Sequence, residues 1–319
     1  MARAFCRTAL KVFDLGWAAM ALLVCGLAWL GWVFKDAHPW TQWISFVPAP
    51  AVIGFALVWL FLTLPGRFRV LQLVVFATTF AGMFKILVLD TRWHRAPAEL
   101  PEDALRIVHW NTAHGIMGAE AILRTLAEDA PDMCLITEPP RVSKMEEMAY
   151  YALGMKYIMT AGEMTFASHY PLRRGARMDL GAGLAWSVVV ETPHGPLEVV
   201  NVDMVSRPNL NRHRPLRLLS GWIASNRTGH PLLVVGDFNT VRDSTALRPL
   251  RGQVRHAYEA AGTGWPYSWP TLFPLYAIDH LWFDEGIEPL HYRLKPTRFS
   301  DHKSQIFDFR MRRQPVGEG

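Results

Sequence analysis

Hydrophobic residues follow different patterns in the two parts of this chain. The first 94 residues hold three long apolar stretches, at 15–34, 44–64 and 70–89, and Lys85 is the only charged residue within them. Each stretch is long enough for a helix to cross a hydrocarbon layer of roughly 30 Å. The pattern therefore predicts a membrane domain over 1–94 with three transmembrane helices, rather than buried helices of a soluble core.

Charged residues beside these stretches predict their orientation. Five basic residues lie at the N-terminus and between the second and third stretches: Arg3, Arg7, Lys11, Arg67 and Arg69. Three lie on the opposite side: Lys35, Arg92 and Arg95. Because basic segments are retained in the cytoplasm, we expect a cytoplasmic N-terminus and a chain that is extracytoplasmic after Trp93. This predicts a multi-pass protein of the inner or plasma membrane, with the lipid bilayer as a partner. Lys85 is expected to reach the headgroups from its helix end, the alternative being a functional charge inside the membrane.

Beyond a proline-containing linker at 95–101, short apolar runs alternate with polar segments. Strand-like runs lie at 105–110, 133–137, 185–190, 197–202, 232–235 and 277–283, and helical patterns lie at 119–128 and 212–226. The two runs around the Thr-Pro-His-Gly-Pro turn are typical of a hairpin. A segment of this length and pattern predicts one α+β domain over 102–319.

Composition narrows the classes of partner. The net charge of +5 belongs wholly to the first 94 residues, which hold eight Lys/Arg and three Asp/Glu, while the rest holds 25 of each. A neutral domain has no bulk positive field for a nucleic acid backbone, so nucleic acid is an unlikely partner. Three scattered cysteines do not predict a disulfide framework or a zinc site. The oligomeric state is not predicted.

Chemically useful polar residues stand beside the predicted strands of this domain. They are Asn111, Glu138, Asp203, Asp237, Asn239, Asp279, His280, Asp301 and His302. A single Asp after a strand is usually a turn former or a helix cap. Strand ends of one sheet share a common rim, however, so these nine residues, grouped at six places along the chain, can converge on one site. Asp237 and Asn239, two residues apart after an apolar run, would place a carboxylate and an amide side by side, as a metal ion and its water require.

Short motifs in a fixed order connect these residues to a known superfamily. They are Arg106-Ile-Val-His-Trp-Asn111, Pro131-Asp132 through Glu138, Ser168-His-Tyr-Pro171, Gly236-Asp-Phe-Asn239, Ile278-Asp-His280 and Ser300-Asp-His302. Together they resemble the motifs of the endonuclease/exonuclease/phosphatase superfamily of metal-dependent phosphoesterases. Three spans ahead of such a domain resemble its membrane-anchored bacterial branch, related to the teicoplanin-resistance proteins.

The resemblance implies a DNase I-like two-sheet α/β sandwich with the site at one rim. It implies Mg²⁺, or alternatively Mn²⁺, bound by Glu138, Asn111 and Asp301, and such hard cations do prefer oxygen ligands. Asp237 would orient or deprotonate the attacking water and Asn239 would position the phosphate. Asn111 would hold a metal-bound water or a substrate oxygen. His302, held by Asp279, would donate to a phosphate oxygen.

One departure leaves alternatives open. The superfamily's Asn-Thr-His block is Asn201-Val-Asp203 here, so Asp203 stands where a phosphate-contacting histidine is often found. Asp203 could ligate a metal, repel substrate, or only cap the strand. Arg207 and Arg212 could steer an anionic headgroup, or form a solvated helix face. The leading expectation is a phosphohydrolase acting on a lipid-linked phosphate or pyrophosphate, with an extracytoplasmic nuclease or phosphodiesterase and an inactive binding module as the alternatives.

Overall fold

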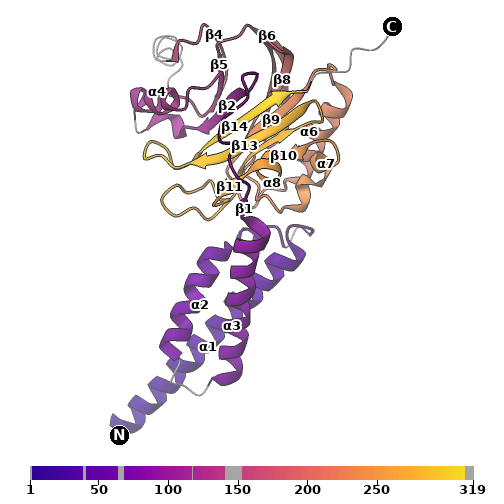
Figure 1. Ribbon diagram of the computed structural model, residues 1–319. Coiled ribbons are helices and arrows are strands. Elements are labelled where there is room, and N and C mark those ends of the chain that lie inside the picture. The colour runs from indigo at the N-terminus through magenta and orange to yellow at the C-terminus, as the bar shows by residue number, and fades with distance from the viewer. Residues whose placement is uncertain (1, 39–40, 64–67, 117, 141–152, 313–319) are drawn as a thin grey trace. The chain divides into compact units, whose positions relative to one another are not determined.

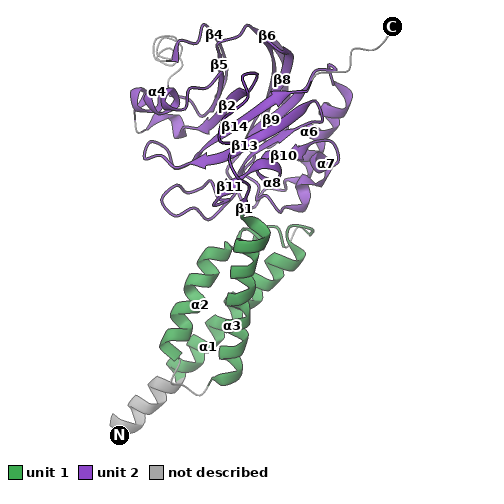
Figure 2. Ribbon diagram, viewed as in Figure 1, with its two compact units in different colours: residues 1–91 green, residues 92–319 purple. Residues whose placement is uncertain are grey.

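The computed structural model of the protein describes residues 2–38, 41–63, 68–116, 118–140 and 153–312, and the side chains from residue 12 onward. The chain divides into two compact units, Met1–Thr91 and Arg92–Gly319 (Figure 2). The predicted domain boundaries at 94 and 102 stay predictions.

The first unit is built from three apolar helices: α1 (Ala2–Phe34), α2 (Ala49–Thr63) and α3 (Arg69–Phe84). They pack on one another through a small buried cluster that includes Ala21, Ala56 and Val75. The buried indole of Trp59 donates its N–H to the carbonyl of Trp17 at 3.1 Å. Many large apolar side chains on the other faces stay exposed, which a helix surrounded by lipid requires and a soluble helix avoids.

Two helical stretches are long and apolar enough to cross a membrane, Val12–Phe34 and Arg69–Asp90. The predicted span 44–64 is shorter than expected in its described part. Its first residues form a 3-10 turn, η1 (Ile44–Phe46), and Val47 is extended because it precedes a proline. Helix α2 then has 15 residues, or about 22 Å. Residues 64–67, which include Arg67 of the orientation argument, lie outside the described residues.

Lys85 has a partner that the sequence analysis did not consider. The π-helical turn η2 (Lys85–Asp90) continues α3 and places these two residues together. Lys85 Nζ lies 3.0 Å from Asp90 Oδ2, and both side chains are largely buried. The charge of Lys85 is therefore compensated within its own turn of helix.

The second unit contains two six-stranded sheets (Figure 1). The first sheet has the order β10-β12-β9-β8-β7-β6, with β10 (Arg255–His256), β12 (Asp279–Phe283), β9 (Leu232–Asp237), β8 (Gly195–Met204), β7 (Gly183–Thr192) and β6 (Leu172–Asp179). The second has the order β13-β14-β2-β3-β5-β4, with β13 (Ile287–Lys295), β14 (Ser304–Met311), β2 (Leu105–Asn111), β3 (Met133–Thr137), β5 (Met164–Ser168) and β4 (Tyr157–Ala161). A separate short pair joins β1 (Arg92–Trp93) to β11 (Thr263–Gly264).

Alternation along the strands explains how the layers assemble. In β2, Leu105 and Ile107 enter the core between the sheets, while Val108 and Trp110 face outward against α4 (Ala119–Glu128). The first sheet is covered in the same way on its outer face by α6 (His213–Ser225), η4 (Thr245–Leu247) and α7 (Arg248–Arg251). The described residues of this unit also form two short helices, η3 (Ala113–Gly115) and α8 (Ala257–Ala261). The predicted two-sheet α/β sandwich is therefore confirmed.

Strand direction brings the predicted polar residues to one rim. Strands β2 and β3 are parallel, as are β8 and β9, and all four end there. Strands β12 and β14 run antiparallel to β9 and β2, so they begin at the same rim. Asp279 and His302 consequently stand at strand starts rather than strand ends. The inward-facing residues Asp203, Asp237 and Asp279 lie opposite one another across three adjacent strands.

Candidate active site

The turn after β9 is shaped by close backbone packing. A Cβ on Gly236 would lie 1.9 Å from the carbonyl oxygen of Val202 in β8, so only glycine fits. The next residue, Asp237, shares the inward face with Val235. Asn239 leaves the strand with φ 43°, a conformation that asparagine tolerates better than most residues. Its backbone N–H donates to Asp237 Oδ1 at 2.9 Å, and its side-chain amide donates to the carbonyl of Met204 at 2.6 Å.

Asn111 connects the two sheets at the rim. Its amide Nδ2 lies 3.1 Å from Asp237 Oδ2 and 3.2 Å from Glu138 Oε1. Glu138 is held at φ 47°, a strained conformation for a glutamate. The hydroxyl of Thr112 donates to the Glu138 carbonyl at 2.7 Å, and the backbone N–H of His114 donates to it at 2.8 Å. The surrounding chain therefore fixes Glu138 in the position from which its carboxylate faces Asn111.

Asp279 and His302 form a buried pair beside Asp237. His302 Nδ1 lies 2.9 Å from Asp279 Oδ2, and His302 Nε2 lies 3.9 Å from Asp237 Oδ2. The backbone around His302 is fixed from two sides: Trp110 Nε1 donates to its carbonyl at 2.9 Å, and its own N–H donates to Ser300 Oγ at 3.0 Å. The imidazole therefore has Nδ1 beside Asp279 and Nε2 on the side of Asp237.

Charge is distributed unevenly among these groups. Burial alone would lower the pKa of His302, but the charge and hydrogen bond of Asp279 outweigh it and raise that pKa to about 10. For Asp279, burial opposes ionisation, and the His302 cation overcomes it and lowers the pKa. Burial raises the pKa of Asp237 to about 8, and the nearby Asp279 charge adds to this effect. The rim thus holds an imidazolium–carboxylate pair and a second carboxylate without a full counter-charge.

The donor set fits a hard divalent cation. Ligand atoms of Asp237, Asp279 and His302 all lie within 4.8 Å of one another. His302 is a poor ligand, because a protonated imidazole whose Nδ1 already faces Asp279 has no lone pair to offer. Asp279 Oδ1 has no partner among the described residues. Oxygen atoms of Glu138 and Asp237 are the better match for Mg²⁺ or Mn²⁺. Asn111 directs its Nδ2 at both of them, and its Oδ1 accepts from the backbone N–H of Ala113 at 3.0 Å.

Two predicted site residues lie beside this centre. Asp301 is exposed, and its carboxylate accepts a hydrogen bond from Trp269 Nε1 at 2.8 Å. Asp203 faces the rim opposite Asp237, and its pKa is raised to about 7 by burial and by the charge of Glu138. The roles predicted for these residues stay predictions.

The two predicted arginines differ strongly in environment. Arg207 is exposed, whereas Arg212 is buried and donates to the carbonyls of Val205 and Arg207. Arg212 Nε and Nη1 have no partner in the part of the chain that the structure describes. Burial lowers the pKa of Arg212, and Asp237 opposes that shift. Arg212 thus has a buried, unpaired guanidinium edge that Arg207 lacks, and the anion-steering role predicted for both stays a prediction.

Sequence reasoning missed a buried polar chain behind the rim. Tyr292 donates to Gln305 Oε1 at 2.7 Å, Gln305 Nε2 lies 2.8 Å from His109 Nδ1, and His109 Nε2 lies 3.3 Å from Thr137 Oγ1. Burial lowers the pKa of His109 to about 4, so this imidazole is neutral. The alternation that places Asn111 at the rim could have identified His109, which lies two residues earlier on the same face.

His114 also lies closer to the centre than expected. Its side chain is largely exposed. Its Nε2 nevertheless lies 3.4 Å from Glu138 Oε2, and its Nδ1 lies 3.5 Å from Glu163 Oε2. No pattern in the sequence marks this contact, because it depends on the left-handed turn at Ala113 and His114.

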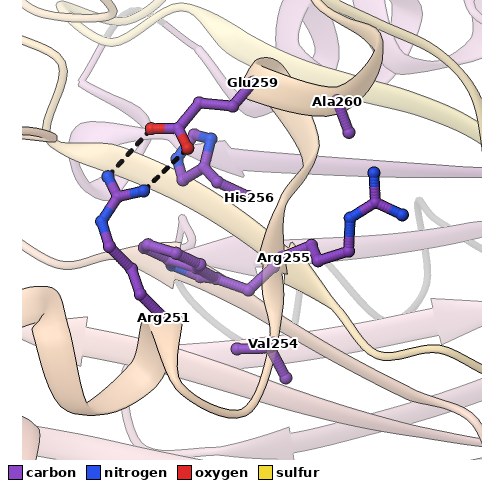
Figure 3. A pocket seen from close by; sticks show the side chains of 7 residues that line it. Arg251, Val254, Arg255, His256, Glu259 and Ala260 are labelled. Carbon is purple, nitrogen blue, oxygen red and sulfur yellow. Dashed lines mark hydrogen bonds and ion pairs between the residues drawn. The ribbon is translucent and has the colours of Figure 1, made fainter.

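A cavity of about 250 Å³ lies elsewhere on the first sheet, beside β10 and α8 (Figure 3). Arg251 pairs with both carboxylate oxygens of Glu259 across it, at 2.7 and 2.9 Å. His256 lines the cavity and lies 3.1 Å from His280, which faces the outer side of the sheet. None of the residues at the rim lines this cavity, so it is separate from the candidate active site.

Two sheets with a carboxylate, amide and imidazole centre at one rim define a DNase I-like phosphoesterase sandwich. Comparison with protein families agrees: the model of the Endonuclease/Exonuclease/phosphatase family matches residues 108–302, more than half of the chain. The chain belongs to this family. A search of curated proteins finds no match.

Solved structures confirm the fold. An endonuclease/exonuclease/phosphatase from Beutenbergia cavernae superposes with a TM-score of 0.55 at 15% identity, covering 68% of this chain and 74% of its own. TDP2 of D. rerio, in complex with a single-strand DNA product, has a TM-score of 0.52 at 15% identity and covers 66% of this chain and 100% of its own. The catalytic domain of human nocturnin, with bound sulfate, has a TM-score of 0.50 at 16% identity, with 68% and 99% covered. These similarities describe the sandwich of the second unit.

Proposed function

We propose that the protein is a membrane-anchored, divalent-metal-dependent phosphohydrolase that cleaves a lipid-linked phosphate or pyrophosphate. The observation that carries the proposal is the arrangement of Asn111, Glu138 and Asp237 beside the Asp279–His302 pair, in a chain that also holds two long apolar helices. The arrangement of the rim residues supports the hydrolytic chemistry, and the two apolar helices support a substrate held in the membrane.

Each residue at the rim has a task that its environment favours. Asp237 orients and deprotonates the attacking water, since burial keeps its pKa near neutral pH, where a general base is most effective. His302 donates to a phosphate oxygen, and Asp279 keeps it charged and correctly turned. Arg212 offers its unused guanidinium edge to the anion. Glu138 and Asn111, with Asp301 as an additional ligand, would hold Mg²⁺ or Mn²⁺, which supplies charge relief on the phosphate oxygens.

Anchoring through the apolar helices of the first unit favours a lipid substrate. A domain anchored in a bilayer meets lipid headgroups at a high effective concentration, whereas it gains nothing toward a soluble polymer. The neutral charge of the chain after residue 94 agrees, because nucleic acid binding draws on many positive side chains. We infer a place in the membrane-anchored branch related to the teicoplanin-resistance proteins, with the N-terminus in the cytoplasm and the catalytic domain outside it.

Phosphate release from a polyprenyl pyrophosphate by the full-length protein, in detergent with Mg²⁺, tests this function. Asp237→Asn should abolish release. Asp179→Asn is the matched control, because Asp179 is an exposed carboxylate that only caps a turn through the N–H of Gly181. Absence of release, or release that Asp237→Asn leaves unchanged, would overturn the proposal.

A nuclease or phosphodiesterase is the second candidate, favoured by one observation. The similar structure of D. rerio TDP2 holds a single-strand DNA product, so this fold can accept nucleic acid. Nicking of plasmid DNA that weakens with added salt would support this alternative. An inactive binding module is the third candidate, since Asp203 replaces a histidine. Calorimetry that detects no binding of Mg²⁺ or Mn²⁺ would favour it.

A further inference from the structure

The loop between β11 and β12 presents an apolar tip to solvent. No charged residue occurs from Ala260 to Ile278. At the tip, Leu272 is 84% exposed and Phe273 is 76% exposed. Scattered exposed apolar residues are normal on protein surfaces. Two adjacent large apolar side chains at the end of an uncharged loop form a small apolar patch, and such patches mark interaction surfaces.

The base of the loop is closed by backbone hydrogen bonds. Trp269 and Tyr276 pair as in a hairpin, with N–H groups donating to the partner carbonyls at 3.0 and 2.8 Å. Trp265, 40% exposed, donates its indole N–H to the carbonyl of Pro274 at 3.2 Å. The six residues 270–275 therefore form one closed loop between Trp269 and Tyr276.

This loop is attached directly to the active site. The indole of Trp269 donates to Asp301, and its ring centre lies 6.4 Å from that of His302. The backbone N–H of Thr271 donates to the Asp301 carbonyl at 2.7 Å. On the other side of the loop, Ser268 Oγ lies 3.3 Å from the backbone nitrogen of Asp279. Both members of the Asp279–His302 pair are thus fixed to the loop that carries the tip.

The loop also begins beside the strand that follows the second candidate span. Arg92 and Trp93 of β1 pair with Gly264 and Thr263 of β11, just before Trp265. Only Thr91 separates Asp90, the last residue of that span, from β1. Two residues of extended chain reach about 7 Å at most, so covalent geometry keeps the start of the loop close to the end of the span.

We propose that residues 269–276 form an interfacial loop, which buries Leu272 and Phe273 in the surface of the lipid bilayer. The partner is the boundary between headgroups and acyl chains, where apolar side chains leave water and an indole such as that of Trp265 is well placed. The loop presents a bilayer-held phosphate to His302, and this role rests on the proposed phosphohydrolase function. The membrane contact itself does not.

Kinetics on two substrates tests the role in presentation. The full-length protein in phosphatidylcholine/phosphatidylglycerol nanodiscs is given either a lipid phosphate held in the disc or water-soluble bis(p-nitrophenyl) phosphate. The double variant Leu272→Ser, Phe273→Ser should lower kcat/KM on the lipid by about tenfold or more, given the favourable burial of each side chain. It should leave kcat/KM on the soluble ester within about twofold of the parent value. Leu218→Ser, at an exposed leucine of α6, is the matched control and should change neither. An unchanged lipid rate, or an equal fall on both substrates, would overturn the presentation role.

A second measurement does not depend on catalysis. A fluorophore on Phe273→Cys, in a variant whose three native cysteines are replaced by alanine, should be quenched by doxyl-labelled lipids in the nanodisc. The same label at Leu218→Cys should not be quenched. Quenching without hydrolysis of any phosphate would reject the proposed function and keep the membrane contact. Hydrolysis without quenching would reject the membrane contact, as would a signal that depends on protein copies per disc, which would identify a second copy of this chain as the partner.

Discussion

Replacing Asp279 by asparagine removes the negative charge that holds His302 and leaves the shape of the side chain unchanged. The carboxylate lies 2.9 Å from His302 Nδ1, and both side chains are at least nine-tenths buried. Water therefore cannot replace the lost charge. Asp237 becomes the nearest carboxylate to His302, at 3.9 Å from Nε2, and can compensate only in part.

The loss of stability expected for Asp279→Asn follows from the raised pKa of His302. The pKa of His302 rises from the ordinary 6.5 to about 10, and each unit corresponds to about 1.4 kcal/mol. The pair therefore contributes about 5 kcal/mol at most. Breaking a buried pair by removing one partner typically costs about 3–5 kcal/mol. Because Asp237 takes over part of the role, we expect Asp279→Asn to lower the free energy of unfolding by about 3 kcal/mol.

The loss should depend on pH in a defined direction. The raised pKa of His302 gives stability that is complete below 6.5 and disappears as the pH rises toward 10. The lowered pKa of Asp279 gives stability that is present above 3.8 and disappears as the pH falls further. The pair is thus worth most between about pH 4 and 6.5. The difference between parent and Asp279→Asn should be largest at pH 5.5 and small at pH 9.5.

Urea unfolding of the full-length protein in detergent with EDTA, at pH 5.5, 7.5 and 9.5, measures this difference. Glu259→Gln provides the control, because it breaks the ion pair between Arg251 and Glu259. Both side chains of this pair are about one-third exposed. An exposed pair contributes about 1 kcal/mol or less. A loss of equal size at all three pH values, or no greater than that of the control, would refute the charge-pair account of His302.

Three further predictions concern the turn and the tether. Gly236→Ala should lower stability by about 2–3 kcal/mol in urea unfolding, because the new methyl group meets the carbonyl oxygen of Val202; an unchanged midpoint would contradict the close approach of β8 and β9. Asp237→Asn should be at least as stable as the parent in metal-free buffer at pH 7, because burial raises the Asp237 pKa to about 8 and makes its ionisation costly. Mg²⁺ should raise the Tm of the parent alone, and an equal rise in the variant would contradict a role of Asp237 in the cation site. A cysteine at Ala98 should react with a membrane-impermeant reagent in intact cells if the chain crosses three times, and labelling only after lysis would place the domain in the cytoplasm.

Much of the fold could be predicted because it depends on local periodicity. Helix α4 and strand β3 begin and end at the predicted residues, and β2 and β9 extend the predicted runs only into Asn111 and Asp237. Their side chains alternate or repeat at intervals that sequence displays directly. Strands at the sheet edges escaped prediction. Strand β6, for example, has exposed side chains along most of its length, so no apolar face marks it.

The contacts at the rim could be predicted only in part. Asp237 and Asp279 lie opposite one another at the rim because each continues the alternation of an apolar strand. The middle span was overestimated because hydropathy alone ignores what Pro48 does to Val47, which the structure places in an extended conformation. The contact of His114 with Glu138, and the unused edge of Arg212, depend on loop conformation rather than on periodicity.

The active site exists only when the two sheets are packed together. Asp237 and Asp279 come from the first sheet, while Asn111 belongs to the second and His302 lies two residues before its strand β14. The hydrogen bonds from Asn111 to Asp237 and from His302 to Asp279 connect the two sheets at the rim. A cation or phosphate that contacts both halves therefore binds only the folded sandwich, and it stabilises the packing of the sheets by mass action. A cation bound by both halves would thus offset the cost of burying Asp237 without a full counter-charge.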